Sequence, residues 1–102
     1  MLKLENNIKV YVPIIKGREG SINYIRNKMS RAFGGTTEYR ARGSWIDNYG
    51  ETIFDDIMIV ESFTDKSIND IKRLASEYVE IIKMDLKQEA VSIEINNILY
   101  II

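Results

Sequence analysis

Apolar and polar residues alternate in three stretches of this chain, with the period of two that is typical of strands. Residues 8–15 form the first stretch, and its strand should end near Pro13, because proline cannot donate a ladder hydrogen bond. Residues 36–63 form the second stretch, with a turn rich in Asp, Asn and Gly near its middle, which predicts a long hairpin. Residues 88–102 predict a second hairpin that turns at Asn96 and Asn97.

Apolar residues recur every three to four positions in two other stretches, which predicts amphipathic helices. The first helix should span residues 21–33, with Ser21 as its N-cap and the following glycine pair as its end. The second helix should start at Ser67 and continue to Leu86. Each helix has one apolar stripe, so each needs an apolar surface to cover, and a sheet provides one.

The elements run strand, helix, two strands, helix, two strands, which predicts an α+β fold. The first six fit a ferredoxin-like two-layer sandwich, βαββαβ, in which two helices cover one face of an antiparallel sheet. The last strand of the C-terminal hairpin should extend the sheet beside the fourth strand and give the spatial order 5-4-1-3-2. A chain of 102 residues fits a single α+β domain over residues 1–102.

This topology should gather three connections at one end of the sheet: the loop 16–21, the hairpin tip 45–50 and the joint 87–89. The first helix also points its N-terminus there, with its partial positive charge. Arginine forks suit phosphate or carboxylate groups, and an indole suits stacking on a base. The predicted ligand-binding residues are Lys16, Arg18, Arg40, Arg42, Trp45, Tyr49 and Gln88.

The face of the sheet opposite the helices is expected to be apolar. A large contiguous apolar patch is uncommon on a soluble monomer. We therefore expect a homo-oligomer, formed through the open sheet face or through an edge strand. The predicted interface residues are Tyr11, Met58, Val60, Leu99 and Ile101.

The amino-acid composition limits the kinds of catalysis and the partners that we expect. The chain has no cysteine and no histidine, which excludes thiolate nucleophiles, disulfides and imidazole acid–base catalysis, and we expect no metal and no cofactor. Fourteen basic and fifteen acidic residues give a net charge of −1, which disfavours nucleic acid as a partner. No stretch has the pattern of a signal peptide or a transmembrane helix, so we expect a cytoplasmic protein without membrane contact.

Several short motifs lie in the middle and at the end of the chain: FGGTT at 33–37, GSW at 43–45, Glu61, and QEAV at 88–91. Their order and spacing resemble those of small bacterial proteins of unknown function, in which FGG-x-T, G-x-W and QEAV-like steps follow one another. The resemblance covers residues 10–100. It implies the ferredoxin-like fold and no particular reaction. Arg40 and Arg42 depart from the pattern of these families, and a function particular to this chain would lie there.

Three classes of function remain open. The favoured one is a non-enzymatic binding module for an anionic, nucleotide-like small molecule or for a protein partner, such as a host factor that a phage or plasmid protein would block. The first alternative is binding of single-stranded nucleic acid on the sheet face by basic and aromatic side chains. The second is a small enzyme that uses carboxylates, although no two carboxylates have a diagnostic spacing.

Overall fold

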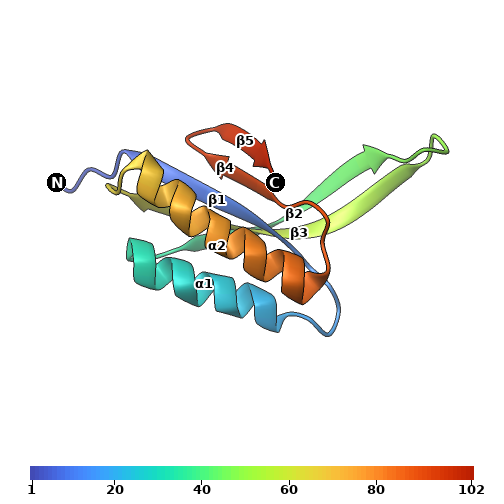
Figure 1. The fold of residues 1–102 in the computed structure, drawn as a ribbon, viewed down its shortest axis with the longest axis horizontal. Coiled ribbons are helices and arrows are strands. Elements are labelled where there is room, and N and C mark those ends of the chain that lie inside the picture. The colour runs from blue at the N-terminus through green and yellow to red at the C-terminus, as the bar shows by residue number, and fades with distance from the viewer.

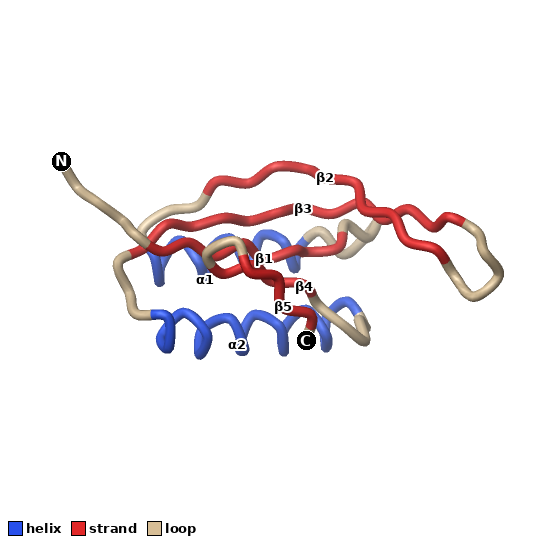
Figure 2. Tube along the Cα trace, turned by 90° about the horizontal axis from the view of Figure 1, so that it is seen from above, coloured by secondary structure: helices blue, strands red, loops and turns tan.

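The alternating stretches form one antiparallel sheet of five strands, and the two amphipathic stretches form two helices (Figure 1). The computed structural model describes residues 1–102. The elements in chain order are β1 Asn6–Pro13, α1 Gly20–Phe33, β2 Thr37–Ile46, β3 Thr52–Thr64, α2 Ile68–Leu86, β4 Ser92–Ile95 and β5 Ile98–Ile101. Both helices lie on the same face of the sheet, which makes two layers (Figure 2).

The predicted α+β class and strand order are confirmed. The observed order is β2-β3-β1-β4-β5, which is the predicted order read from the other edge. Four strands and two helices are compatible with the ferredoxin-like plan, and β5 adds a strand beyond the four of that plan. β1 starts earlier than predicted, at Asn6, and ends at Pro13, where the lack of a backbone N–H was expected to end it.

The two helices begin in different ways. Ser67 caps α2 as predicted, because its hydroxyl accepts a hydrogen bond from the backbone N–H of Asp70 at 3.2 Å. The prediction that Ser21 caps α1 is wrong: α1 starts one residue earlier, and Ser21 is buried within its first turn. Backbone carbonyls of Arg18 and Glu19 accept the first N–H groups of α1, so no side-chain cap is needed. Neither helix combines the length and apolar character that crossing a membrane requires.

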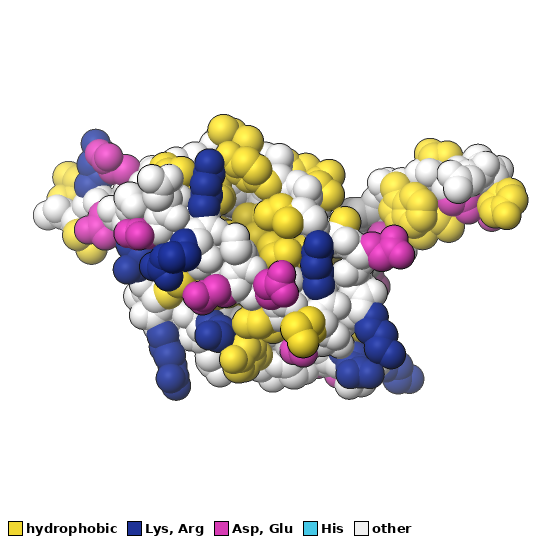
Figure 3. Space-filling view, viewed as in Figure 1, with side chains coloured by type: hydrophobic (Ala, Val, Ile, Leu, Met, Phe, Trp, Pro, Cys, Tyr) yellow, Lys and Arg dark blue, Asp and Glu magenta, His cyan; other side chains and the backbone are white.

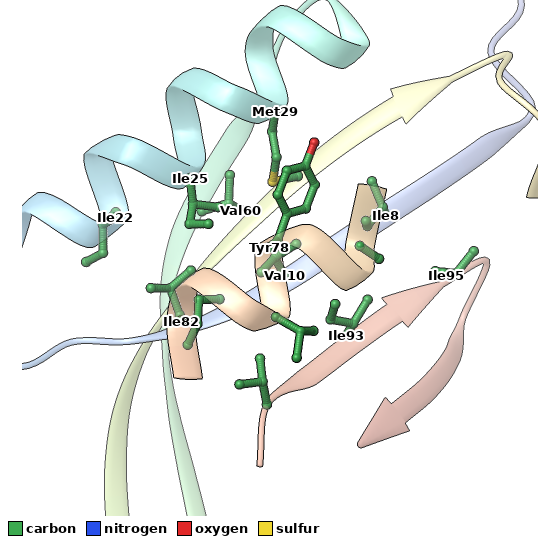
Figure 4. Close-up of a cluster of buried hydrophobic side chains, with 14 of the residues drawn as sticks. Ile8, Val10, Ile22, Ile25, Met29, Val60, Tyr78, Ile82, Ile93 and Ile95 are labelled. Atoms are coloured by element: carbon green, nitrogen blue, oxygen red, sulfur yellow. The ribbon is translucent and has the colours of Figure 1, made fainter. Parts of the chain in front are cut away.

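Sixteen buried apolar residues form the core between the helices and the sheet (Figure 4). β1 lies in the middle of the sheet and contributes Ile8, Val10 and Val12, none of which has exposed surface. Ile25 of α1 and Ile82 of α2 are also fully buried. Burial of each such side chain contributes about 1.5–3 kcal/mol, so this core is the main source of stability.

The predicted placement of Met58 and Val60 on the open face is wrong. Val60 is opposite Val10 and Met58 is opposite Val12 in the pairing of β1 with β3. Residues directly opposite one another share a face of the sheet, and Val10 and Val12 belong to the core. Met58 and Val60 therefore face the helices and cannot form an interface on the open face.

The β2–β3 hairpin extends beyond the rest of the sheet as a two-stranded arm, residues 42–56 (Figures 1 and 2). β1 ends opposite Ile57, so no third strand accompanies the arm. The arm contributes to the elongated shape of 50 × 27 × 22 Å. Large apolar side chains stand exposed along it (Figure 3): Trp45, Ile46, Tyr49 and Phe54.

One polar atom is buried in the core without a hydrogen-bond partner, the hydroxyl of Tyr78 on α2. Its ring packs near Met29 of α1 (Figure 4), and burial raises the pKa of Tyr78 to about 12. An unpaired buried hydroxyl costs roughly 1–3 kcal/mol. We expect Tyr78→Phe to raise the free energy of unfolding by about 1 kcal/mol in urea denaturation. Tyr24→Phe, at an exposed position of α1, is the matched control, and a destabilised Tyr78→Phe variant would contradict this account.

Candidate active site

An open cleft of about 490 Å³ lies at the end of the uncovered sheet face, where the arm meets the body. Tyr11, Pro13 and Ile57 come from neighbouring strands and form its floor. One wall is the base of the arm in β3, and the other is the connection from α2 to β4. Three segments that are distant in the sequence therefore meet at this cleft.

The charge of the cleft is negative. Asp55 and Asp56 line it, and none of its lining residues is a lysine or an arginine. The indole N–H of Trp45 donates a hydrogen bond of 3.0 Å to Oδ2 of Asp55 and fixes the position of this carboxylate. Because opposite charges attract and like charges repel, this cleft favours a cationic ligand over an anionic one.

A polar cluster continues from the cleft along the open face. Tyr11, on the cleft floor, donates its hydroxyl hydrogen to Glu94 of β4 at 2.6 Å. The ammonium of Lys9 lies 3.9 Å from the same carboxylate. Further along β1, Asn7 donates from its amide to Glu61 of β3 at 2.9 Å. The expectation of an apolar open face is therefore wrong, since polar side chains from three strands interact across it.

The hydrogen bond to Glu94, together with burial, raises the pKa of Tyr11 to about 12. Tyr11 therefore keeps its proton at neutral pH and serves as a donor. The negative charge of Glu94, and then contact with Tyr39, raise the pKa of Lys9, so Lys9 stays charged. The cluster thus holds the Glu94 carboxylate in a fixed position beside the acidic cleft, through the Tyr11 hydroxyl and the Lys9 ammonium.

Gln88 is the one predicted ligand-binding residue that lines the cleft. Its side-chain amide donates to the carbonyl of Leu86 at 3.0 Å, which holds it at the end of α2. Lys16 and Arg18 lie exposed in the loop between β1 and α1 and do not line the cleft.

The other predicted residues are spread over the arm and β2. Trp45 and Tyr49 are carried outward, because β2 and β3 stay paired as far as Ile46 and Thr52. Arg40 faces the helix side, where it lines a separate groove near Arg26. The guanidinium of Arg42 stacks 3.8 Å from the centre of the Phe54 ring, also on the arm. The predicted anion site is therefore not assembled.

Sequence reasoning missed Glu94 and Lys9, and it named Glu61 among the motifs that carry the family resemblance. A signal for this cluster was present. Asn7, Lys9 and Tyr11 alternate with the core residues of β1, so all three had to share the uncovered face. Glu94 stands between two isoleucines of β4 and had to point to the same side. Nowhere in the chain do three acidic side chains gather in an arrangement that could hold a metal ion.

No family model and no curated protein matches this chain. Two solved structures are similar to it. One is a phage SAM lyase in complex with S-methyl-5′-thioadenosine, with a TM-score of 0.73 and 15% identity over 100% of this chain and 94% of that chain. The other is a phage SAM lyase in its apo state, with a TM-score of 0.72 and 17% identity over the same shares. At this identity the likeness establishes the fold.

Both similar structures are of an enzyme, which contradicts the expectation of a non-enzymatic binding module. The acidic lining of the cleft also differs from the basic site that was expected at this end of the molecule. This chain therefore shares its fold with the two similar structures and has a negatively charged cleft at the open face of its sheet.

Proposed function

We propose that this chain is a lyase that acts on a positively charged sulfonium nucleoside of the S-adenosylmethionine (SAM) type. The observation that carries this proposal is the lining of the cleft, which holds two aspartates and no basic residue. The shared fold with SAM lyases supports the same class of ligand. Apolar side chains of the floor, such as Ile57, offer a surface for the adenosyl group.

The chemistry of such a ligand fits an acidic cleft. The sulfonium sulfur of SAM carries a positive charge. When the bond from sulfur to the amino-acid chain breaks, its electron pair returns to sulfur, and neutral S-methyl-5′-thioadenosine remains. The carbon that was bonded to sulfur has two possible fates. It bonds to the carboxylate of the same amino-acid part and forms a lactone, or the neighbouring carbon loses a proton to a base and the two carbons form an alkene. Both routes balance without a second substrate.

The residues of the site have separate roles in this proposal. Asp55 attracts the positive charge from the arm side of the cleft. Glu94, which the Tyr11 hydroxyl on the cleft floor holds in place, faces the ammonium group of the amino-acid part of the ligand. The amino-acid part of the ligand is flexible, so its orientation relative to the sulfonium determines the rate of cleavage. The reacting atoms must be held in a near-attack geometry.

The direct test is incubation of the purified protein with SAM, followed by chromatography and mass spectrometry of the products. We expect S-methyl-5′-thioadenosine to accumulate in proportion to protein concentration, faster than in buffer alone. The mass of the second product, a lactone or an unsaturated amino acid, identifies the route. If SAM remains at the level of the buffer control, the proposed function is wrong.

We also propose that the chain forms a homo-oligomer. Exposed apolar side chains lie on the arm and on β5, which is an edge strand of the sheet. Light scattering after size exclusion should give a mass above the 11.8 kDa of one chain. Replacing Leu99 and Ile101 together by aspartate should lower that mass, whereas Met84→Asp on the exposed side of α2 should not. A wild-type mass of one chain at tens of micromolar would contradict self-association.

A further inference from the structure

The arm places one carboxylate at the cleft in a defined orientation. Asp55 and Trp45 lie on the same face of the arm, diagonally across the β2–β3 ladder. The residue opposite Asp55 is Gly43, and a side chain there would meet Cδ1 of Ile57 at 3.2 Å. The glycine therefore lets the Ile57 side chain lie close to β2 at the base of the arm. The cleft floor and the Asp55–Trp45 pair are thus built next to each other.

No basic side chain neutralises Asp55. It takes part in no ion pair, and Arg42, the one basic residue of the arm, stacks on the Phe54 ring. One oxygen of Asp55 accepts the hydrogen bond from Trp45, which leaves the second oxygen without a hydrogen bond within the chain. The negative charge of Asp55 is therefore available at the wall of the cleft.

We infer that Asp55, positioned by Trp45, is the residue that makes the cleft select a positively charged sulfonium over the neutral thioether it becomes. This inference rests on the proposed function and assigns its charge specificity to one side chain. The attraction between Asp55 and the ligand exists only while the sulfur is charged. When the sulfur becomes neutral, that attraction ends, and release of the product is favoured over release of the substrate.

The test compares two adenosyl ligands that keep the amino-acid chain and differ in charge near the sulfur position. Sinefungin carries an ammonium group there, and S-adenosylhomocysteine is a neutral thioether. Isothermal titration calorimetry should show that the wild-type protein binds sinefungin more tightly. Asp55→Asn should weaken sinefungin binding about fivefold, as expected for a partly solvated charge pair, and leave S-adenosylhomocysteine binding unchanged.

The matched control is Glu51→Gln, which removes one negative charge from the chain next to the arm turn, away from the cleft. It should leave both affinities unchanged. If Asp55→Asn lowers both affinities equally, or neither, the inference is wrong while the proposed function stands. If the wild-type protein binds neither ligand, the proposed function fails together with the inference.

Trp45 provides a second readout, because it is the only tryptophan of the chain. Sinefungin should change the Trp45 fluorescence in the wild-type protein, and the midpoint of this change should move to about fivefold higher sinefungin concentration in Asp55→Asn. Trp45→Phe keeps an aromatic ring but lacks the N–H donor, so it should reduce the preference for sinefungin about twofold. An unchanged preference in Trp45→Phe would show that Asp55 does not depend on Trp45 for its position.

Discussion

Replacing Glu94 by glutamine is expected to lower kcat/KM for SAM cleavage by about 100-fold, the usual cost of a misplaced reacting group. Glu94 accepts the hydrogen bond of Tyr11 at 2.6 Å, and in the proposed function its negative charge faces the amino-acid part of the substrate. Glutamine keeps the shape and an acceptor oxygen for Tyr11 but removes the charge. The fold should therefore persist while the amino-acid chain loses its fixed position.

Two measurements check this prediction. Steady-state kinetics should show the loss in kcat/KM, and NMR titration of labelled tyrosine should show the pKa of Tyr11 falling from about 12 towards its ordinary value. Glu61→Gln is the matched control, because Glu61 lies on the same face and bonds to Asn7 instead of Tyr11. Equal activities of the Glu94 and Glu61 variants would contradict the role given to Glu94.

Ile82→Ala is expected to cause the largest loss of stability, about 3–4 kcal/mol of unfolding free energy. Ile82 has no exposed surface and packs in the core between α2 and the sheet. Its truncation removes buried methyl groups and leaves a cavity that rigid neighbours fill only in part. Since domains of this size unfold at about 5–15 kcal/mol, this loss would consume a large part of the total.

Urea denaturation followed by circular dichroism measures this loss. Met84→Ala is the control, since Met84 lies in the same helix and is 76% exposed. It should change the unfolding free energy by less than about 0.5 kcal/mol. A loss below about 1 kcal/mol for Ile82→Ala would mean that the helix does not pack on the sheet as described.

The elements and their order were predictable from local patterns. The helical stripes, the alternation in Asn6–Pro13 and the paired asparagines at Asn96 and Asn97 each fix a local conformation, and the topology follows from their order. Both asparagines adopt the positive φ angles that a two-residue turn requires, at 50° and 68°.

The faces of the sheet were harder to assign. β3 is apolar on both sides around Ile57, Met58 and Ile59, so its own pattern does not say which side is buried. The pairing of β3 with the clearly alternating β1 decides the question, and a shift of one residue exchanges the two faces. Met58 and Val60 were misplaced for this reason.

The candidate site was missed because the prediction placed the tip of the hairpin and the hairpin's basic side chains beside the loop 16–21, at one end of the sheet. Arg40 and Arg42 were expected at an anion site, yet they alternate onto the helix side of β2. The cleft instead forms where three segments meet, and its acidic character depends on how far the arm extends past Ile57. That length is a property of the strand pairing, which sequence patterns set only approximately.

Binding of an adenosyl ligand at the acidic cleft underlies the proposed function, and NMR chemical-shift mapping can locate this binding residue by residue. Sinefungin would be titrated into ¹⁵N-labelled protein, and the backbone resonances that move would be mapped on the sheet. We predict the largest changes at Tyr11, Ile57 and Ser92, which line the cleft. Changes centred on Arg40 and the groove beside Arg26, or no changes at saturating ligand, would contradict the account.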